Sequence, residues 1–211
     1  MKICEIFTSI QGESSYAGLP CTFIRLAGCN LRCSYCDTKY AYEEGAELSV
    51  DEIVARTARA GIDLVEITGG EPLLQEGVHD LAERLLSEGH TVLVETNGSR
   101  SIRNVDKRAV VILDIKTPGS GMDSEMDFSN LDIIKKRDEV KFVLTGRRDY
   151  EWAKDIIGAH NLLERSRVLM SPAFGILSPR DLCGWMIEDR LPARLNLQLH
   201  KYIFGPEERG V

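Results

Sequence analysis

The sequence lacks a long apolar run, a block of like charge and any excess of positive charge. No stretch of about 18 or more apolar residues occurs among its 211 residues, so no segment is expected to span a bilayer. The formal net charge is −7, which argues against nucleic acid or a membrane surface as a partner. The first residues, MKICEIFTSIQGESS, also lack the apolar core of a signal peptide. We therefore expect a cytoplasmic protein whose thiols stay reduced.

Paired metal-binding motifs are also missing. The four histidines show no metal-ligand spacing, and three of the six cysteines (Cys4, Cys21 and Cys183) stand alone among apolar residues. Isolated cysteines of this kind commonly behave as small buried apolar side chains. The other three cysteines form the pattern C-x3-C-x2-C within CNLRCSYC, at residues 29–36.

Three kinds of site could use this cysteine motif. A structural zinc site typically needs four closed ligands, and no fourth ligand lies nearby. A thioredoxin-like pair, Cys33 and Cys36, would leave Cys29 without a role. A [4Fe–4S] cluster held by Cys29, Cys33 and Cys36 keeps one iron open to another ligand. The spacing favours the cluster over the zinc site and the redox pair.

Short apolar runs alternate with helical patterns along the whole chain. The expected strands cover residues 21–27, 62–68, 90–96, 109–115, 140–145, 167–170 and 195–200. The expected helices cover residues 49–61, 77–89, 149–165 and 178–190, the first opened by a Ser49–Glu52 capping box. Such alternation predicts a parallel sheet with helices outside. The length is short for an eight-fold barrel, so we expect one domain over residues 1–211 that forms a partial (β/α) barrel.

Polar and glycine-rich segments follow most of the expected strands. They are TGGEP (68–72), ETNG (95–98), DIKTPG (114–119), MSPAFG (170–175) and LHKY (199–202). Because the carboxyl ends of parallel strands meet at one rim, we expect an active site there. A phosphate-binding loop is a weaker interpretation of GGEP, since Glu71 would repel an anion and Pro72 has no N–H to donate.

The cysteine motif followed by a GGEP strand end resembles the radical S-adenosylmethionine (SAM) enzymes. With EIFTSIQGE (5–13), ETNG and LHKY, the resemblance narrows to the 7-carboxy-7-deazaguanine synthase family and extends over nearly the whole chain. It implies that SAM chelates the open iron and is cleaved to a 5′-deoxyadenosyl radical. It also implies conversion of 6-carboxy-5,6,7,8-tetrahydropterin to 7-carboxy-7-deazaguanine, with loss of ammonia, on the way to queuosine.

The resemblance assigns residues to three ligands. The substrate set is Ile10, Gln11, Gly12, Glu13, Arg25, Thr68, His200 and Pro206. The SAM set is Tyr35, Cys36, Asp37, Gly69, Gly70, Glu71, Lys116, Ser171 and Pro172. Thr38 is implied as a ligand of Mg2+, a hard cation that prefers oxygen donors. A planar arginine suits the pterin carboxylate, although Arg25 could instead form a rim salt bridge, and His200 could be only a structural hydrogen-bonding group.

The chain departs from some relatives at three places. Asp114-Ile115-Lys116 replaces Ser-Pro-Lys, Ser171-Pro172 replaces Gln-Pro, and five residues follow Pro206, where some relatives end at the proline and use its carboxylate at the substrate. The resemblance further implies a homodimer and an external one-electron reductant such as flavodoxin or ferredoxin. Two other functions stay open at this point: an activase that installs a glycyl radical on a partner enzyme, and a zinc-binding module without catalytic activity.

Overall fold

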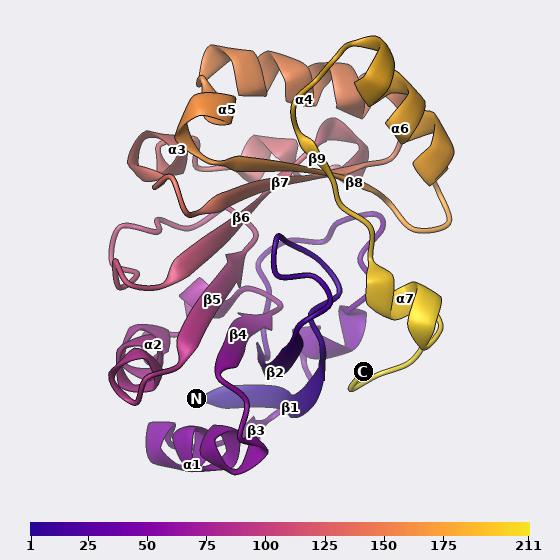
Figure 1. Cartoon of the computed structure of the whole chain (residues 1–211). Coiled ribbons are helices and arrows are strands. Elements are labelled where there is room, and N and C mark those ends of the chain that lie inside the picture. Colours follow the sequence, from indigo (N-terminus) through magenta and orange to yellow (C-terminus); the bar gives the residue numbers. More distant parts are fainter.

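The computed structural model describes residues 1–211 and contains a nine-stranded sheet of order β3-β1-β2-β4-β5-β6-β7-β8-β9 (Figure 1). Its strands are β1 Lys2–Ile10, β2 Pro20–Leu26, β3 Ala46–Glu47, β4 Leu64–Gly69, β5 Thr91–Thr96, β6 Val110–Lys116, β7 Glu139–Leu144, β8 Arg167–Pro172 and β9 Arg194–Leu195. From β2 through β9 each strand in this order pairs parallel with the next. The sheet curves without closing, which confirms the partial barrel.

Helices cover the outer side of the curved sheet. They are α1 Val50–Ala60, α2 Val78–Ser87, α3 Asn130–Ile133, α4 Arg147–Ala159, α5 Leu162–Arg165 and α6 Pro179–Glu188, and α7 Leu199–Ile203 lies apart on the open side (Figure 1). The predicted capping box at Ser49 and Glu52 is present at the start of α1. No helix is both long and apolar enough to cross a membrane.

Two predicted elements differ from the structure. The strand expected at 195–200 is wrong beyond Leu195. After β9 the chain no longer pairs with β8 and bends toward the open side of the barrel. There the Leu199 N–H donates to the Gly12 carbonyl at 2.8 Å, and α7 begins. The helix expected at 149–165 is interrupted, because Asn161 adopts a left-handed conformation (φ 50°) that separates α4 from α5.

Two strands, β1 and the short β3, lie outside the strands that the sequence predicts. β1 pairs antiparallel with β2 and with β3, at the edge of the parallel sheet. Its segment, KICEIFTSI, alternates only partly between apolar and polar residues, and it was interpreted as a family motif and not as a strand. β1 matters for the site because the loop after it carries Gln11, Gly12 and Glu13.

The two faces of the sheet carry different side chains. The outward face joins the helices in a core of 35 buried residues. Toward the amino ends of the strands the inward face carries a small apolar cluster, which we call the floor of the barrel: Cys21, Phe23, Leu64, Leu93, Val110 and Ile112. Above this floor the inward side chains become polar and charged, and the candidate site lies there.

Candidate active site at the carboxyl ends of the strands

A cavity of about 690 Å³ opens above the floor, between the cysteine loop and the segment that contains α7. Apart from Glu71 and Pro172, the predicted site residues line it: Ile10, Gln11, Gly12, Glu13, Arg25, Cys29, Cys33, Tyr35, Cys36, Asp37, Thr38, Thr68, Gly69, Gly70, Lys116, Ser171, His200 and Pro206. Residues that are far apart in the sequence are thus collected in one place.

The three motif cysteines belong to the loop that follows β2. All three are free thiols and line the cavity, whereas Cys21 is buried in the floor. The loop is tied to the segment after β6, because the Ser34 N–H donates to the Ser120 carbonyl at 3.0 Å and the Ser34 hydroxyl donates to the Gly119 carbonyl at 2.8 Å.

The three thiols fit a polynuclear cluster. They do not converge with other ligating side chains on a point where one metal ion would sit. A cubane does not require such convergence, because each thiolate binds a different iron atom. The donor chemistry, three thiols at one wall of a cavity, suits a [4Fe–4S] cluster with an open iron.

The glycines of the TGGEP segment are required by close backbone packing. A Cβ on Gly69, whose φ is +153°, would lie 2.3 Å from the Leu26 carbonyl oxygen. A Cβ on Gly70 would lie 2.1 Å from the Gly28 carbonyl oxygen and 2.8 Å from the Cys29 Cβ. The end of β4 therefore packs directly against the start of the cysteine loop, where no side chain can fit.

Glu71 has a different place from the one expected. Its carboxylate is fully buried and accepts hydrogen bonds from the Leu73 N–H (2.9 Å), the Thr96 hydroxyl (2.8 Å) and the Asn97 N–H (2.7 Å). These bonds join the end of β4 to the end of β5. The side chain thus holds the rim together and does not line the cavity, and its expected contact with SAM stays a prediction.

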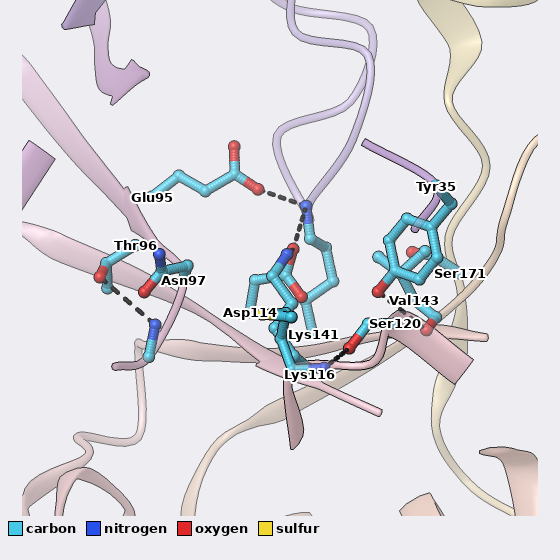
Figure 2. Close-up of polar contacts among 12 residues, drawn as sticks. Tyr35, Glu95, Thr96, Asn97, Asp114, Lys116, Ser120, Lys141, Val143 and Ser171 are labelled. Atoms are coloured by element: carbon cyan, nitrogen blue, oxygen red, sulfur yellow. Dashed lines mark hydrogen bonds and ion pairs between the residues drawn. The ribbon is translucent and has the colours of Figure 1, made fainter. Parts of the chain in front are cut away.

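Lys116, Tyr35 and Ser171 lie on the β6–β8 side of the cavity, whereas Asp37 pairs with Lys201 on α7. Lys116 forms an ion pair with Asp114 at 2.8 Å. The Tyr35 hydroxyl donates to the Val143 carbonyl at 3.4 Å (Figure 2). The Ser171 hydroxyl accepts from the Asn196 amide at 2.8 Å. Pro172 instead faces a neighbouring groove that it shares with Phe174. Its place at the cofactor stays a prediction.

The loop after β1 and helix α7 meet across the cavity. A Cβ on Gly12 would lie 2.1 Å from the His200 Nδ1, so only glycine permits this approach. The sequence predicted that His200 lies at a strand end, but in the structure it lies on helix α7. The Gln11 side-chain oxygen accepts from the Glu13 N–H at 2.8 Å, and its amide nitrogen donates to Glu66.

Arg25 takes part in a salt bridge and still faces the cavity. Its Nε donates to the Glu5 carboxylate at 2.7 Å, and the Tyr40 hydroxyl donates to the same oxygen at 2.9 Å. The two terminal nitrogens of the guanidinium have no hydrogen-bond partner in the protein. The salt bridge expected as an alternative role therefore exists, and it fixes the orientation of a group whose outer donors stay available.

A layer of buried charges above the floor was not predicted. Lys141 on β7 forms an ion pair with Glu95 on β5, and its ammonium lies 3.6 Å from Asp114 on β6 (Figure 2). The same ammonium pairs with Glu13 at 3.0 Å. Glu66 on β4 belongs to the same layer. The signal was present in the sequence, because Glu66, Glu95 and Lys141 are charged residues within the otherwise apolar strand segments VEIT, VLVET and VKFVL.

The charges of this layer determine one another. Burial disfavours the charged form of Lys141, but Glu13 and Glu95 outweigh burial and raise the pKa of the lysine well above its usual value. Burial would likewise raise the pKa of Glu13, but the neighbouring Lys141 ammonium outweighs burial and lowers it. Burial, followed by the neighbouring Glu95, raises the pKa of Glu66 well above its usual value.

The fold and the site together define a class of protein. The model of the radical SAM superfamily matches residues 23–157, which include the cysteine loop and the strands that surround the cavity. The crystal structure of QueE from Escherichia coli superimposes with a TM-score of 0.79 at 25% identity, over 94% of each chain.

Sequence relatives narrow the class further. The 7-carboxy-7-deazaguanine synthase of Koribacter versatilis is 46% identical over 226 aligned positions that cover the whole of both chains. That of Chlorobaculum tepidum is 47% identical, over 100% of this chain and 97% of its own. The protein belongs to the 7-carboxy-7-deazaguanine synthase family of radical SAM enzymes. Its cofactors are accordingly a [4Fe–4S] cluster and SAM.

Proposed function

We propose that the protein converts 6-carboxy-5,6,7,8-tetrahydropterin to 7-carboxy-7-deazaguanine and releases ammonia. The observation that carries this proposal is the shared cavity. Gln11, Arg25 and His200 come from three separate segments and line one cavity together with the three thiols of the cysteine motif. The proposal treats residues 1–211 as one radical SAM domain.

The cluster would be held by Cys29, Cys33 and Cys36. When bound, the cluster and SAM supply an organic radical that takes a hydrogen atom from the substrate. Gly69 and Gly70 offer backbone groups beside Cys29, where a side chain would collide. Lys116, Ser171, Tyr35 and Asp37 line the same part of the cavity and are the candidates for contacts with SAM.

The substrate carboxylate would bind Arg25. The Glu5 carboxylate holds the Nε of this arginine, which leaves a planar pair of donors for a second carboxylate. Gln11 and Glu13 supply an amide and a carboxylate for the donor and acceptor edge of the pterin. Burial lowers the pKa of His200, so this imidazole is uncharged near pH 7 and serves as a hydrogen-bonding group.

Three partners complete the proposal. Thr38, whose hydroxyl donates to Asp37 at 2.9 Å, is the candidate protein ligand of a Mg2+ ion near the substrate carboxylate. An external one-electron donor such as flavodoxin or ferredoxin would reduce the cluster. We further propose a cytoplasmic homodimer, on the strength of the family.

The test is turnover under strictly anaerobic conditions. Wild-type protein reconstituted with iron and sulfide should form 7-carboxy-7-deazaguanine from the carboxytetrahydropterin, SAM and a reductant, as detected by mass spectrometry. Cleavage of SAM without this product would contradict the proposal and would favour an activase of a partner enzyme.

Arg25→Lys makes the test specific for the substrate. Lysine keeps the charge but loses the planar pair of donors, which should cost about 1.5–3 kcal/mol, or roughly 10- to 150-fold in kcat/KM. Cleavage of SAM in the absence of substrate should change little, because the cysteine loop is untouched. Equal kcat/KM values for the variant and the wild type would show that Arg25 does not bind the substrate.

A further inference from the structure

Glu66 is a buried acid that the proposed roles do not use. It lies in the middle of β4 and is only 2% exposed, directly above the apolar floor of the barrel. Its register partners are Phe23 on β2 and Leu93 on β5, both part of that floor. An ionised carboxylate is costly in such surroundings unless a cation faces it.

The cations nearby are already engaged. Lys141, 4% exposed, faces Glu13, Glu95 and Asp114, and Lys116 pairs with Asp114. Two lysines thus face three carboxylates before Glu66 is counted. A fourth negative charge would find no partner among these lysines, and burial beside Glu95 raises the pKa of Glu66 well above its usual value.

The neighbours of Glu66 connect it to the substrate site. Its carboxyl group accepts from the Gln11 amide. Glu95 lies on the same face of the neighbouring strand β5, two residues after Leu93, which is the register partner of Glu66. The side chain of Glu95 is 24% exposed and lines the cavity, and it accepts from the Thr68 hydroxyl at 3.4 Å. Gln11 and Thr68 both belong to the proposed substrate set, so Glu95 reaches the cavity between two substrate contacts.

We propose that Glu66 and Glu95 share a single proton and deliver it, through Glu95, to the nitrogen that leaves as ammonia. This inference rests on the proposed function. Glu95 is then the catalytic residue, because it faces the substrate. Glu66 is a positioning residue, because it acts through Glu95.

The proton balance closes without any further reactant. Substrate and product differ only by ammonia, so the hydrogen atom removed by the radical is returned and the conversion involves no net oxidation. When the C–N bond breaks, its electron pair stays with the nitrogen, which takes a proton from the pair. Formation of the new ring double bond releases one proton from a ring carbon, and the Glu95 carboxylate accepts it. The pair ends with the proton it began with.

Glu66→Gln removes the acidic proton but keeps the size and shape of the side chain. A glutamine here can accept from the Gln11 amide with its oxygen and donate to Glu95 with its nitrogen, as a neutral carboxylic acid does. The packing is therefore kept while the transferable proton is lost. Glu66→Asp keeps an acid in a shorter side chain and serves as the conservative variant.

Glu139→Gln is the matched control. Glu139 is fully buried on β7, but it does not line the cavity and bonds instead with Ser15, whose N–H donates to it at 3.0 Å. Infrared difference spectra of the reconstituted enzyme should show the carbonyl band of a protonated carboxylic acid in the wild type and in Glu139→Gln. The same band should be missing in Glu66→Gln.

Turnover supplies the second readout. In Glu66→Gln the amount of 7-carboxy-7-deazaguanine per 5′-deoxyadenosine should fall by about 100-fold or more, the usual contribution of a general acid. Glu66→Asp should recover part of the loss, and Glu139→Gln should match the wild type. A wild type without the band, or a Glu66→Gln variant with normal product yield, would overturn the inference. A wild type that makes no product at all would instead overturn the proposed function.

Discussion

The outward and inward faces of the same strands have opposite chemistry. On β4 the outward side chains Val65 and Ile67 are fully buried against helices, whereas the inward Glu66 and Thr68 line the cavity. On β7 the outward Phe142 belongs to the main core, and the inward Lys141 carries three carboxylate contacts. Successive residues of a strand point to opposite faces, so one short segment can serve both purposes.

Within each strand, the outward side chains therefore serve stability and the inward side chains serve function. The outward face removes apolar surface from water and provides the main driving force for folding. The inward face buries charges that contribute little net stability, because their desolvation offsets their attraction. Such charges indicate a site that binds polar ligands. Substitutions on the inward face should therefore affect ligands and chemistry more than substitutions of similar size elsewhere.

The largest effect is expected at the cysteine loop. Cys29→Ala, Cys33→Ala or Cys36→Ala should each abolish SAM cleavage, because each removes one thiolate of the cluster. Cys4→Ser, Cys21→Ser and Cys183→Ser should leave the iron content largely intact, since these residues stand outside the motif. Iron and sulfide analysis with the visible absorption spectrum checks both groups. Loss of the cluster in Cys183→Ser, together with a normal Cys29→Ala variant, would reverse the assignment.

The second-largest effect is expected for Gly70→Ala, at the rim where β4 meets the cysteine loop. Its Cβ would overlap the Gly28 carbonyl oxygen at 2.1 Å, so the cysteine loop must move and most of the bound iron should be lost. Overpacking of this kind also costs about 1–3 kcal/mol of unfolding free energy.

Gly184→Ala is the control for Gly70→Ala. Gly184 is exposed within α6, and a Cβ there has no neighbour within 4 Å. This variant should gain about 0.5–1 kcal/mol from helix propensity and keep its iron. Chemical denaturation and iron analysis distinguish the two variants, and normal iron content in Gly70→Ala would refute the close packing of the rim.

Lys141→Met tests whether the charged layer depends on its lysine. Removal of this cation leaves Glu13 and Glu95 without their main partner, so the unfolding free energy should fall by about 3–5 kcal/mol. Lys154→Met is the matched change on the outside, where the lysine pairs with Glu151 and Asp189, and it should cost far less. Equal losses in urea denaturation would mean that the two charge clusters are equivalent.

Thr38→Ala should give the smallest change. The variant loses one neutral oxygen donor, and Mg2+ can replace it with water, so the apparent Mg2+ affinity should weaken by about 10-fold. SAM cleavage without substrate should be unchanged. A Mg2+ titration of product formation is the measurement, and wild-type behaviour would make Thr38 only a turn residue.

Much of the parallel part of the fold could be predicted from sequence. The runs at 21–27 and 109–115 lie within one residue of β2 and β6, because near-continuous apolar runs mark strands covered by helices. The cysteine spacing and the glycines of TGGEP were equally informative, since thiolate ligands and close backbone contacts restrict the residue type strongly.

The inward charges were not predicted, because Lys141 and Glu66 are single charged residues within otherwise apolar runs. Only the curvature of the sheet shows that β4, β5 and β7 turn these side chains toward one another. The position of His200 was also beyond reach, since it depends on the contact between the α7 segment and Gly12 across the cavity. Long-range contacts of this kind leave no periodic pattern in the sequence.

The most direct test of the account is the transfer of deuterium from the substrate. If the inward face presents the pterin ring to the radical, substrate labelled with deuterium at C6 should pass the label to 5′-deoxyadenosine or to recovered SAM. Mass spectrometry of anaerobic reactions measures this transfer. The account predicts deuterium in the SAM-derived product together with 7-carboxy-7-deazaguanine. Cleavage of SAM at a normal rate, with the label retained in unreacted substrate, would contradict it.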